Sequence, residues 1–375
     1  MTQQSQQIAN PLDRDAVLAV DSAAQIDDIL AMPDHIVDAM WRAESAMMAA
    51  DSAEALIVSG MGGSAIGADL AVAALGNAIA KPVHVVRGYD LPSWVTPGMA
   101  VLCSSYSGST EETLSCYEQA VALGAKIYIV SAGGLISDKG HAAQQPLIGL
   151  PGVLQPRASV AYGVTSTLEV GIATGIVDPS VRADLNAAAE LLRAKTAEWG
   201  PDADSEALPK RLARDAHNRL PVVYGADLTT AIAYRWKCQI NENVKVPAWN
   251  ATLPESNHNE ICSWENAGSI AEHIAWFLRD ADQNERVGKR IEINAKIASD
   301  SGARAEIIDT IGETRIERLF TTVLLGDLIS LYMGVLRGDD PSPVPIIEGL
   351  KDQLGRPASQ PSSQPSSQPS SQPSS

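Results

Sequence analysis

The chain has 375 residues, 45% of them apolar, and this length allows about two domains with an ample core. Its formal net charge is −17 and no local cluster of Lys and Arg offsets it, so we expect no nucleic-acid partner. An anionic substrate must then be held by local donors, because the overall field repels it.

The N-terminus and the cysteines indicate the compartment. The first residues lack the basic and apolar regions of a secretory signal, and no uncharged apolar stretch is long enough to span a bilayer, so we expect no membrane association. The cysteines form no CxxC pair and no cluster with histidine, which predicts reduced thiols in a cytoplasmic protein and no zinc site. Carboxylate metal sites stay open on this reasoning.

The first half of the chain changes from helices to alternating elements. Apolar residues at helical spacing predict helices between about residues 15 and 50. Alternation of strand and helix from Ala55 onward predicts a parallel sheet with helices on both faces. The expected strands are 56–58, 82–86, 101–104 and 126–131, and the expected helices are 65–75 and 111–123. Ser109 and Glu112 have the spacing of a capping box for the second helix.

The same pattern recurs in the second half. A strand at 221–225, a helix at 229–239, a strand-to-helix segment at 270–278, a helix at 286–301 and a strand at 305–308 are expected. Glu118–Val130 and Glu292–Ile308 both have the order helix, Gly-Ala-basic residue, strand, which indicates an internal repeat. The predicted fold class is therefore α/β, with two doubly wound subdomains.

The predicted organisation has six parts. They are a helical arm at 1–50, a first α/β subdomain at 51–178, a helical linker at 179–205, a second α/β subdomain at 206–340, a C-terminal helix at 341–356 and a QPSS-repeat tail at 357–375. The tail has no large apolar residue to bury, so we expect it to be disordered.

Two Ser/Gly-rich loops follow apolar strands, and each leads into a helix. They are Gly60–Ser64 and Ser105–Thr110. Glycine lets backbone N–H groups approach a ligand, hydroxyls add donors, and a helix N-terminus favours an anion. A capped turn is the simpler explanation of the second loop, but three hydroxyls exceed what a cap needs. Two such loops at neighbouring strand ends predict a cradle for the phosphate of a small molecule.

The first loop also fits the dinucleotide-binding fingerprint. Gly60, Gly62 and Ala65 match G-x-G-x-x-G/A. That fold expects an acidic residue after the second strand, where this chain has Arg87. Because an arginine there suits the 2′-phosphate of a dinucleotide, dinucleotide binding stays open as an alternative. A dinucleotide-binding fold does not need the second Ser/Gly-rich loop, which counts against it.

Three further residues are candidates for acid–base chemistry. Arg157 follows a Pro-bracketed loop after the fourth strand, and a surface ion pair explains it equally well. Glu242 lies among amides at a helix end, and His258 lies among polar residues in a loop. An exposed glutamate and a hydrogen-bonded histidine are the commoner explanations of each alone. Together they supply a carboxylate base and an imidazole acid–base group.

Five segments in this order resemble the bifunctional phosphoglucose/phosphomannose isomerase family, whose members have sugar-isomerase (SIS) domains. They are GMGGSAIG, SYSGSTEET, LPGVLQPR, QINENVKVP and LPESNHNEI, and the similarity covers about Ile36 to Leu354. The resemblance implies two SIS-type subdomains, a homodimer and a metal-independent aldose–ketose isomerase with no cofactor. Its substrates would be glucose 6-phosphate, mannose 6-phosphate and fructose 6-phosphate.

The resemblance also implies roles for matching residues. Glu242 would move the proton between C2 and C1, Arg157 would stabilise the enediolate, and His258 would open the sugar ring from the partner subunit. Gly63 and Ser64 would lie against the reacting carbons, Ser105, Ser107 and Thr110 would hold the phosphate, and Lys351 would assist from the C-terminal helix. Ser342 departs from the threonine that family members often carry, which leaves the preference between glucose and mannose open.

Two other functions remain as alternatives. One is a different SIS-domain sugar-phosphate isomerase. The other is a non-enzymatic sugar-phosphate-sensing regulator, which normally carries a basic helix-turn-helix arm. The N-terminal region here is acidic and a poor DNA binder, with Asp13, Asp15, Asp21, Asp27 and Asp28.

Overall fold

The computed structural model describes residues 12–355, and these divide after Ser342 into two units. The first unit contains both sheets. The second contains helix α13 (Pro345–Leu354), and each unit is described by itself. The QPSS-repeat tail and the first eleven residues lie outside the described residues, so the expectation of a disordered tail stays a prediction. The expected boundaries between subdomains also stay predictions.

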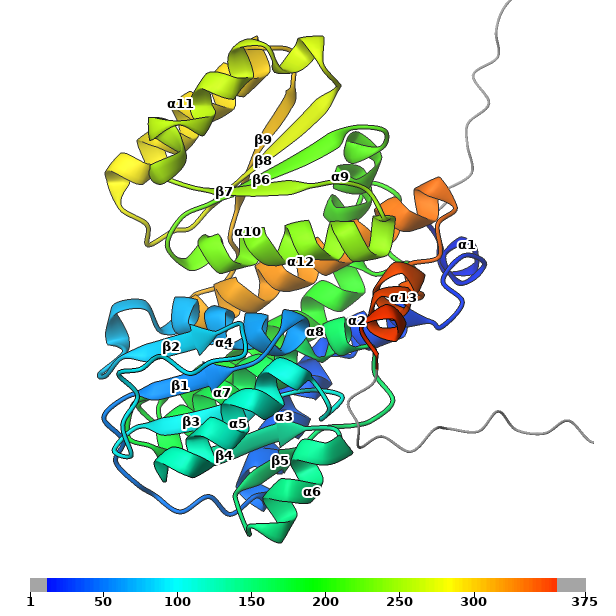
Figure 1. Ribbon diagram of the computed structural model, residues 1–375. Helices are drawn as coiled ribbons and strands as arrows, with labels where there is room; N and C mark the ends of the chain where they lie inside the picture. The colour runs from blue at the N-terminus through cyan, green and yellow to red at the C-terminus, as the bar shows by residue number, and fades with distance from the viewer. Residues whose placement is uncertain (1–11, 356–375) are drawn as a thin grey trace, which may run out of the picture. The chain divides into compact units, whose positions relative to one another are not determined.

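The first sheet is parallel, with the spatial order β2-β1-β3-β4-β5 (Figure 1). Side chains alternate between its faces: Val58 and Leu102 pack with α4 and α7, whereas Ile57 and Val101 pack with α5 and α6. The strands are β1 (Leu56–Ser59), β2 (Val83–Val86), β3 (Ala100–Ser104), β4 (Lys126–Ser131) and β5 (Leu147–Gly149). The helices are α4 (Gly62–Leu75), α5 (Glu111–Leu123), α6 (Gly134–Ala142) and α7 (Val160–Ala173).

The second sheet is also parallel and has the order β7-β6-β8-β9. This is the order of the first four strands of the first sheet, which confirms the expected internal repeat. The strands are β6 (Leu220–Gly225), β7 (Trp249–Thr252), β8 (His273–Arg279) and β9 (Arg304–Asp309). Helix α11 (Glu285–Asp300) packs on one face, and α9 (Leu208–Ala216), α10 (Leu228–Gln239) and α12 (Arg315–Arg337) pack on the other.

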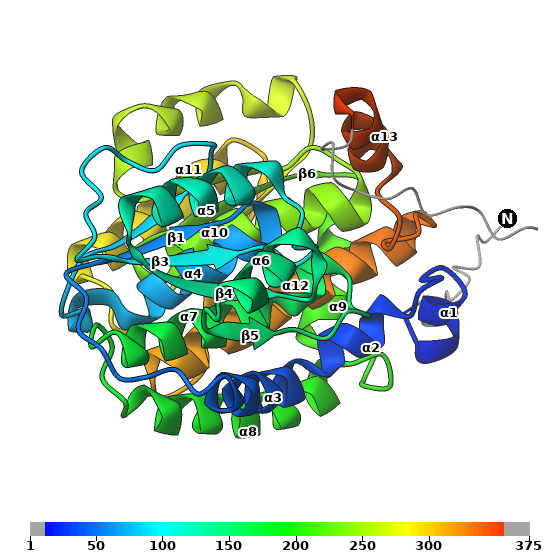
Figure 2. The same ribbon diagram turned by 60° about the horizontal axis from the view of Figure 1, so that its bottom comes forward.

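One hydrophobic core joins the two sheets. It contains Val58 of the first sheet, Trp276 of the second, and the helices between them. Helices α1 (Arg14–Leu18), α2 (Gln25–Leu30), α3 (Met32–Ser45) and α8 (Val181–Trp199) complete the first unit. Figure 2 shows α3 and α8 side by side, and the contacts agree. Helix α8, expected as a linker, packs on α3 and α12.

Helix α12 is the central helix of this core. Among the described residues it is the one helix long and apolar enough to cross a membrane, yet 94% of its apolar window is buried inside the protein. An apolar helix that the rest of the chain covers is explained as a core helix.

Two expectations about local structure are wrong. Thr110, not Ser109, is the N-cap of α5, and no side chain caps that helix, because the Thr110 hydroxyl is bonded to Ser105 instead. Residues 270–278 do not run from strand to helix: β8 begins at His273 and follows a short helical turn that ends at Ser269.

Candidate active site

The two Ser/Gly-rich loops meet at the carboxyl edge of the first sheet. Strands β1 and β3 are neighbours in parallel register, with Ser59 opposite Cys103, so the loops that follow them emerge side by side. Ser64 Oγ accepts a hydrogen bond from the Tyr106 N–H at 3.2 Å, which ties the first loop to the second. The predicted convergence of the two loops is therefore confirmed.

The second loop is a tight, hydroxyl-lined turn. The hydroxyls of Ser105 and Thr110 are 2.9 Å apart, and the Gly108 N–H donates to Ser105 Oγ at 3.1 Å. Gly108 has φ +68°, and a Cβ there would lie 1.7 Å from the Gly133 carbonyl oxygen, so only glycine fits. Ser107 is exposed at the tip. The turn thus presents hydroxyl and N–H donors at the start of α5.

Arg157 lies beside the first loop. It is in the 3₁₀ turn Pro156–Ser159, and a Cβ on Gly63 would lie 2.9 Å from the Pro156 carbonyl oxygen. The loop before the turn is held to the second loop by the Tyr106 hydroxyl, which donates to the Pro151 carbonyl at 2.7 Å and accepts from the Leu154 N–H at 2.9 Å. Burial raises the pKa of Tyr106, so the hydroxyl stays neutral.

The Arg157 guanidinium is buried and held from several sides. Arg157 is 5% exposed, so the alternative of a surface ion pair is wrong. Its Nε donates to Asn243 Oδ1 at 2.9 Å, and its Nη2 donates to the Pro341 carbonyl at 2.6 Å and the Ser342 carbonyl at 2.8 Å. Burial lowers the pKa of Arg157, but an arginine starts so high that it stays charged near neutral pH.

Glu242 lies opposite this cation. It is in the π-helical turn Ile240–Val244 that ends α10, and its Oε2 is 3.5 Å from Arg157 Nη1. The Glu242 side chain is 33% exposed, so a ligand can reach it. A π-turn at the end of an α-helix is frequent at functional sites, because the extra residue changes the direction of the side chains.

Lys245 directly follows this turn as its C-cap residue, and the sequence analysis did not single it out. It adopts φ +60°, and its Nζ donates to the Glu242 carbonyl at 3.3 Å and to the Asp340 carbonyl. Burial, and then the nearby Arg157 charge, lower the pKa of Lys245. Its place in the QINENVKVP segment was the available signal.

One predicted residue, His258, does not join this cluster, and another, Lys351, belongs to the second unit. His258 is exposed in the 3₁₀ turn Glu255–His258, and within residues 12–355 its imidazole has no hydrogen bond or ion pair. Its loop is anchored to α11 of the same chain, where Asn257 donates to Asn294 at 2.9 Å. Lys351 is exposed on α13, in the second unit.

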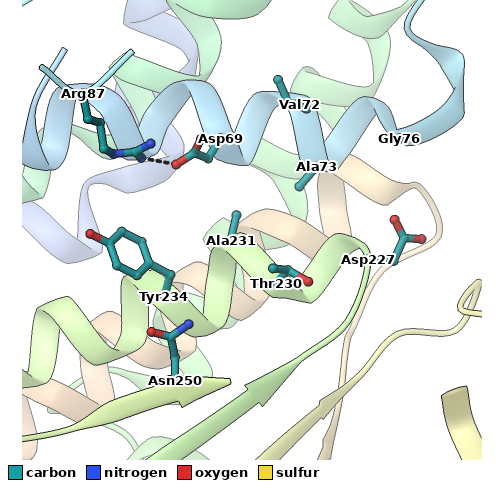
Figure 3. A pocket seen from close by; sticks show the side chains of 10 residues that line it. All are labelled: Asp69, Val72, Ala73, Gly76, Arg87, Asp227, Thr230, Ala231, Tyr234 and Asn250. Carbon is teal, nitrogen blue, oxygen red and sulfur yellow. Dashed lines mark hydrogen bonds and ion pairs between the residues drawn. The ribbon is translucent and has the colours of Figure 1, made fainter. Parts of the chain in front are cut away.

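A cavity of about 580 Å³ lies between α4 and α10 (Figure 3). None of the predicted site residues lines it. Arg87, whose guanidinium the dinucleotide alternative needs for a phosphate, points at Asp69 on the α4 side of this cavity and is ion-paired with it. The lining residues are Asp69, Val72, Ala73, Gly76, Arg87, Asp227, Thr230, Ala231, Tyr234 and Asn250. Within residues 12–355, no group of three or more His, Cys, Asp or Glu side chains is placed to hold a metal ion.

Comparisons with known proteins decide the family. Residues 205–354 match the family model described as the bacterial phospho-glucose isomerase C-terminal SIS domain. A bifunctional phosphoglucose/phosphomannose isomerase of Caldicellulosiruptor bescii is 36% identical over 311 residues, which cover 81% of this chain and 91% of that protein. One of Aquifex aeolicus is 32% identical over 305 residues, covering 81% and 91%.

The chain belongs to the bifunctional phosphoglucose/phosphomannose isomerase family. Membership of this isomerase family confirms the resemblance drawn from the five segments. It also makes the chain an enzyme, so the alternative of a non-enzymatic regulator is wrong. The crystal structure of tagatose-6-phosphate ketose/aldose isomerase from Escherichia coli has the same fold, with a TM-score of 0.62 and 12% identity over 86% of this chain and 95% of that one.

The structure of this isomerase brings together most of the predicted site residues. Gly63, Ser64 and Arg157 are linked by the contacts between their loops, and Arg157 is linked to Glu242. Ser105, Ser107 and Thr110 lie on the adjoining turn. A fixed cation opposite an accessible carboxylate, beside a set of hydroxyl donors, can bind a phosphorylated substrate and move a proton on it.

Proposed function

We propose that the enzyme interconverts glucose 6-phosphate and mannose 6-phosphate with fructose 6-phosphate through a cis-enediolate, without a metal. The observation that carries the proposal is the buried Arg157 guanidinium held 3.5 Å from the accessible Glu242 carboxylate. The names of the relatives support the choice of substrates. The two loops at the end of the first sheet supply the donors that a sugar phosphate needs.

The reaction begins with the open-chain aldose phosphate. Ser105, Ser107 and Thr110 hold the phosphate, and the backbone of Gly63 and Ser64 lies against C1 and C2. Glu242 removes the proton from C2, and the developing charge on the carbonyl oxygen of C1 is stabilised by Arg157. O1 gains a proton and O2 loses one, while Glu242 returns its proton to C1. The product is the ketose.

The same site serves both epimers. Glucose and mannose 6-phosphates differ only at C2, and C2 is planar in the enediolate. Proton return to either face of C2 therefore gives either aldose, provided that the bond between C2 and C3 rotates in the site. We assign ring opening to His258, as the imidazole acid–base group, and an assisting cation to Lys351.

The function is tested with fructose 6-phosphate as the only substrate. We expect both glucose 6-phosphate and mannose 6-phosphate in coupled assays, and equal rates with and without EDTA. Formation of another sugar phosphate in place of these two, or loss of activity in EDTA that zinc restores, contradicts the proposal and favours a different SIS-domain isomerase.

The phosphate site makes a separate prediction. We expect Ser107→Ala to raise KM for fructose 6-phosphate about 10–100-fold, since a hydrogen bond to a charged group contributes about 1.5–3 kcal/mol. Ser109→Ala, in the same turn, is the matched control and should leave KM near the parent value. If both variants bind inorganic phosphate and substrate as the parent does, Ser107 does not hold the phosphate.

We further propose that the enzyme is a homodimer in which His258 enters the partner's site. Support comes from its position: among residues 12–355, no hydrogen bond or ion pair joins the exposed His258 to Arg157 or Glu242. The strand before its loop, β7, is an edge strand, and Trp249 on it is 50% exposed, as suits a protein–protein contact. A two-fold dimer makes the exchange of histidines reciprocal.

Mixing two inactive variants tests this exchange. Glu242→Gln and His258→Ala should each be inactive alone, but a mixed dimer holds one site with both residues intact. At random pairing about half of the dimers are mixed, so about a quarter of the sites should regain activity. If tagged subunits exchange and no activity returns, His258 acts in its own chain. An active monomer leads to the same conclusion.

We place the enzyme in the cytoplasm, in glycolysis or gluconeogenesis. The four cysteines are all free thiols, which suits a reducing compartment. Hexose 6-phosphates are substrates of these pathways, so the location agrees with the proposed reaction.

A further inference from the structure

Gln25 lies in the N-terminal part of the chain, to which the sequence assigned no role. It is the first residue of α2 and only 1% exposed. Its Oε1 accepts a hydrogen bond from Arg157 Nη2 at 2.8 Å, and its Nε2 donates to Asn243 Oδ1 at 3.2 Å. One amide thus touches both the proposed electrophile and the residue next to Glu242.

The directions of these hydrogen bonds are fixed by the arginine. A guanidinium only donates, so the oxygen of Gln25 must face Arg157 and the nitrogen must face Asn243. Asn243 Oδ1 then accepts from both neighbours, and its Nδ2 donates to Ser330 Oγ at 2.9 Å. Ser330 in turn donates to the Asp327 carbonyl at 2.9 Å. This series of hydrogen bonds therefore fixes which way the oxygen and nitrogen of the Gln25 and Asn243 amides point.

These partners orient Arg157 without neutralising it. Gln25, Asn243 and two backbone carbonyls are all uncharged acceptors. Among the described residues, Nη1 is left with Glu242 alone, as an ion pair at 3.5 Å. A cation held by neutral groups keeps its charge for an oxyanion in the site.

Two other buried carboxylates lie nearby, and both are occupied elsewhere. Asp327 forms a bidentate pair with Arg235, at 3.0 and 2.6 Å. Asp21 accepts from the Ile26 N–H at 2.8 Å and from Ser342 Oγ at 3.1 Å. The groups that accept hydrogen bonds from Arg157 are therefore uncharged, although Asp327 and Asp21 are close.

We propose that Gln25 is a positioning residue for the isomerase reaction. Together with Asn243 it fixes Arg157 with Nη1 toward the reacting carbons and keeps the guanidinium free to stabilise the enediolate. This inference rests on the proposed function. It makes helix α2 part of the catalytic machinery.

The test uses Gln25→Glu, which keeps the shape of the side chain and places a carboxylate on Arg157. Two inhibitors report on the charge: 5-phosphoarabinonate carries a carboxylate where the enediolate forms, and glucitol 6-phosphate carries neutral hydroxyls there. We expect Gln25→Glu to weaken binding of 5-phosphoarabinonate, relative to that of glucitol 6-phosphate, by about tenfold or more. We also expect kcat to fall about 10–100-fold with a nearly unchanged KM.

Two further variants make the result decisive. Gln25→Met removes the hydrogen bonds without adding charge, so the ratio of the two inhibition constants should change in the same direction as in Gln25→Glu, but by less. Gln119→Glu alters another hydrogen-bonded amide, on α5, and should change neither value. If either Gln25 variant, shown by circular dichroism to be folded, keeps the parent's ratio, or weakens both inhibitors equally, Gln25 only packs. A parent protein that does not isomerise fructose 6-phosphate counts against the proposed function instead.

Discussion

Glu242→Gln is expected to lower kcat about 10²–10⁴-fold, the usual contribution of a positioned acid–base group. Glutamine keeps the size of the side chain and its hydrogen-bonding oxygen, but it cannot accept a proton from C2. The Glu242 side chain is one-third exposed and is not part of the core, so the fold should be retained. KM for fructose 6-phosphate should change little, because the phosphate is bound elsewhere. Coupled assays of both aldose products measure the effect.

The control for this variant is Glu292→Gln. Glu292 lies on α11 and is ion-paired with Lys289 at 3.1 Å, on an exposed helix face. The control should keep the parent rate, since an exposed ion pair contributes little to stability. A Glu242→Gln enzyme with near-parent turnover removes Glu242 from the mechanism and with it the assignment of the base.

Arg157→Lys is expected to lower kcat about 10²–10³-fold, the effect of losing one oxyanion-stabilising donor. Lysine keeps the positive charge but replaces a planar fork by a single ammonium group, which cannot reach all of the acceptors that hold Arg157. Each buried acceptor left without a donor costs about 1–3 kcal/mol, so the melting temperature should fall as well. Activity is therefore measured at low temperature and corrected for the folded fraction by circular dichroism.

Arg182→Lys serves as the matched substitution outside the site. Arg182 is half exposed and paired with Glu169 at 2.6 Å. It should keep the parent kcat. A folded Arg157→Lys enzyme that also keeps the parent kcat means that the guanidinium does not stabilise the reacting oxygen.

Local patterns in the sequence were enough to predict the main elements of the sheets. The strand Lys126–Ser131 and the helix Glu111–Leu123 have the expected bounds, because each has a clear period and ends at glycine or at a turn. Helix α7 (Val160–Ala173) was not expected, since it is buried on nearly every side and therefore shows no amphipathic period. Thr110 is the N-cap residue of α5, but its hydroxyl bonds to Ser105 across the turn and does not cap the helix, a contact that spacing alone does not reveal.

The site was predictable only in part for the same reason. Residues in motif segments, such as Glu242 and Arg157, stand out by their neighbours. Gln25 does not, because its role comes from a contact 132 residues away with Arg157. Such polar networks form when distant segments pack, and no local propensity records them.

The account's central claim is that Glu242 moves a proton through an enediolate, and isotope exchange tests it most directly. Fructose 6-phosphate is incubated with the parent enzyme and with Glu242→Gln in deuterium oxide, and the C1 proton signals are followed by NMR over many turnovers. We expect the parent to replace one C1 hydrogen by deuterium and to form both aldoses labelled at C2, and Glu242→Gln to do neither at a comparable rate. The account is contradicted if the parent isomerises the sugar over hundreds of turnovers without incorporating deuterium at C1 or C2. It is also contradicted if Glu242→Gln incorporates deuterium as fast as the parent.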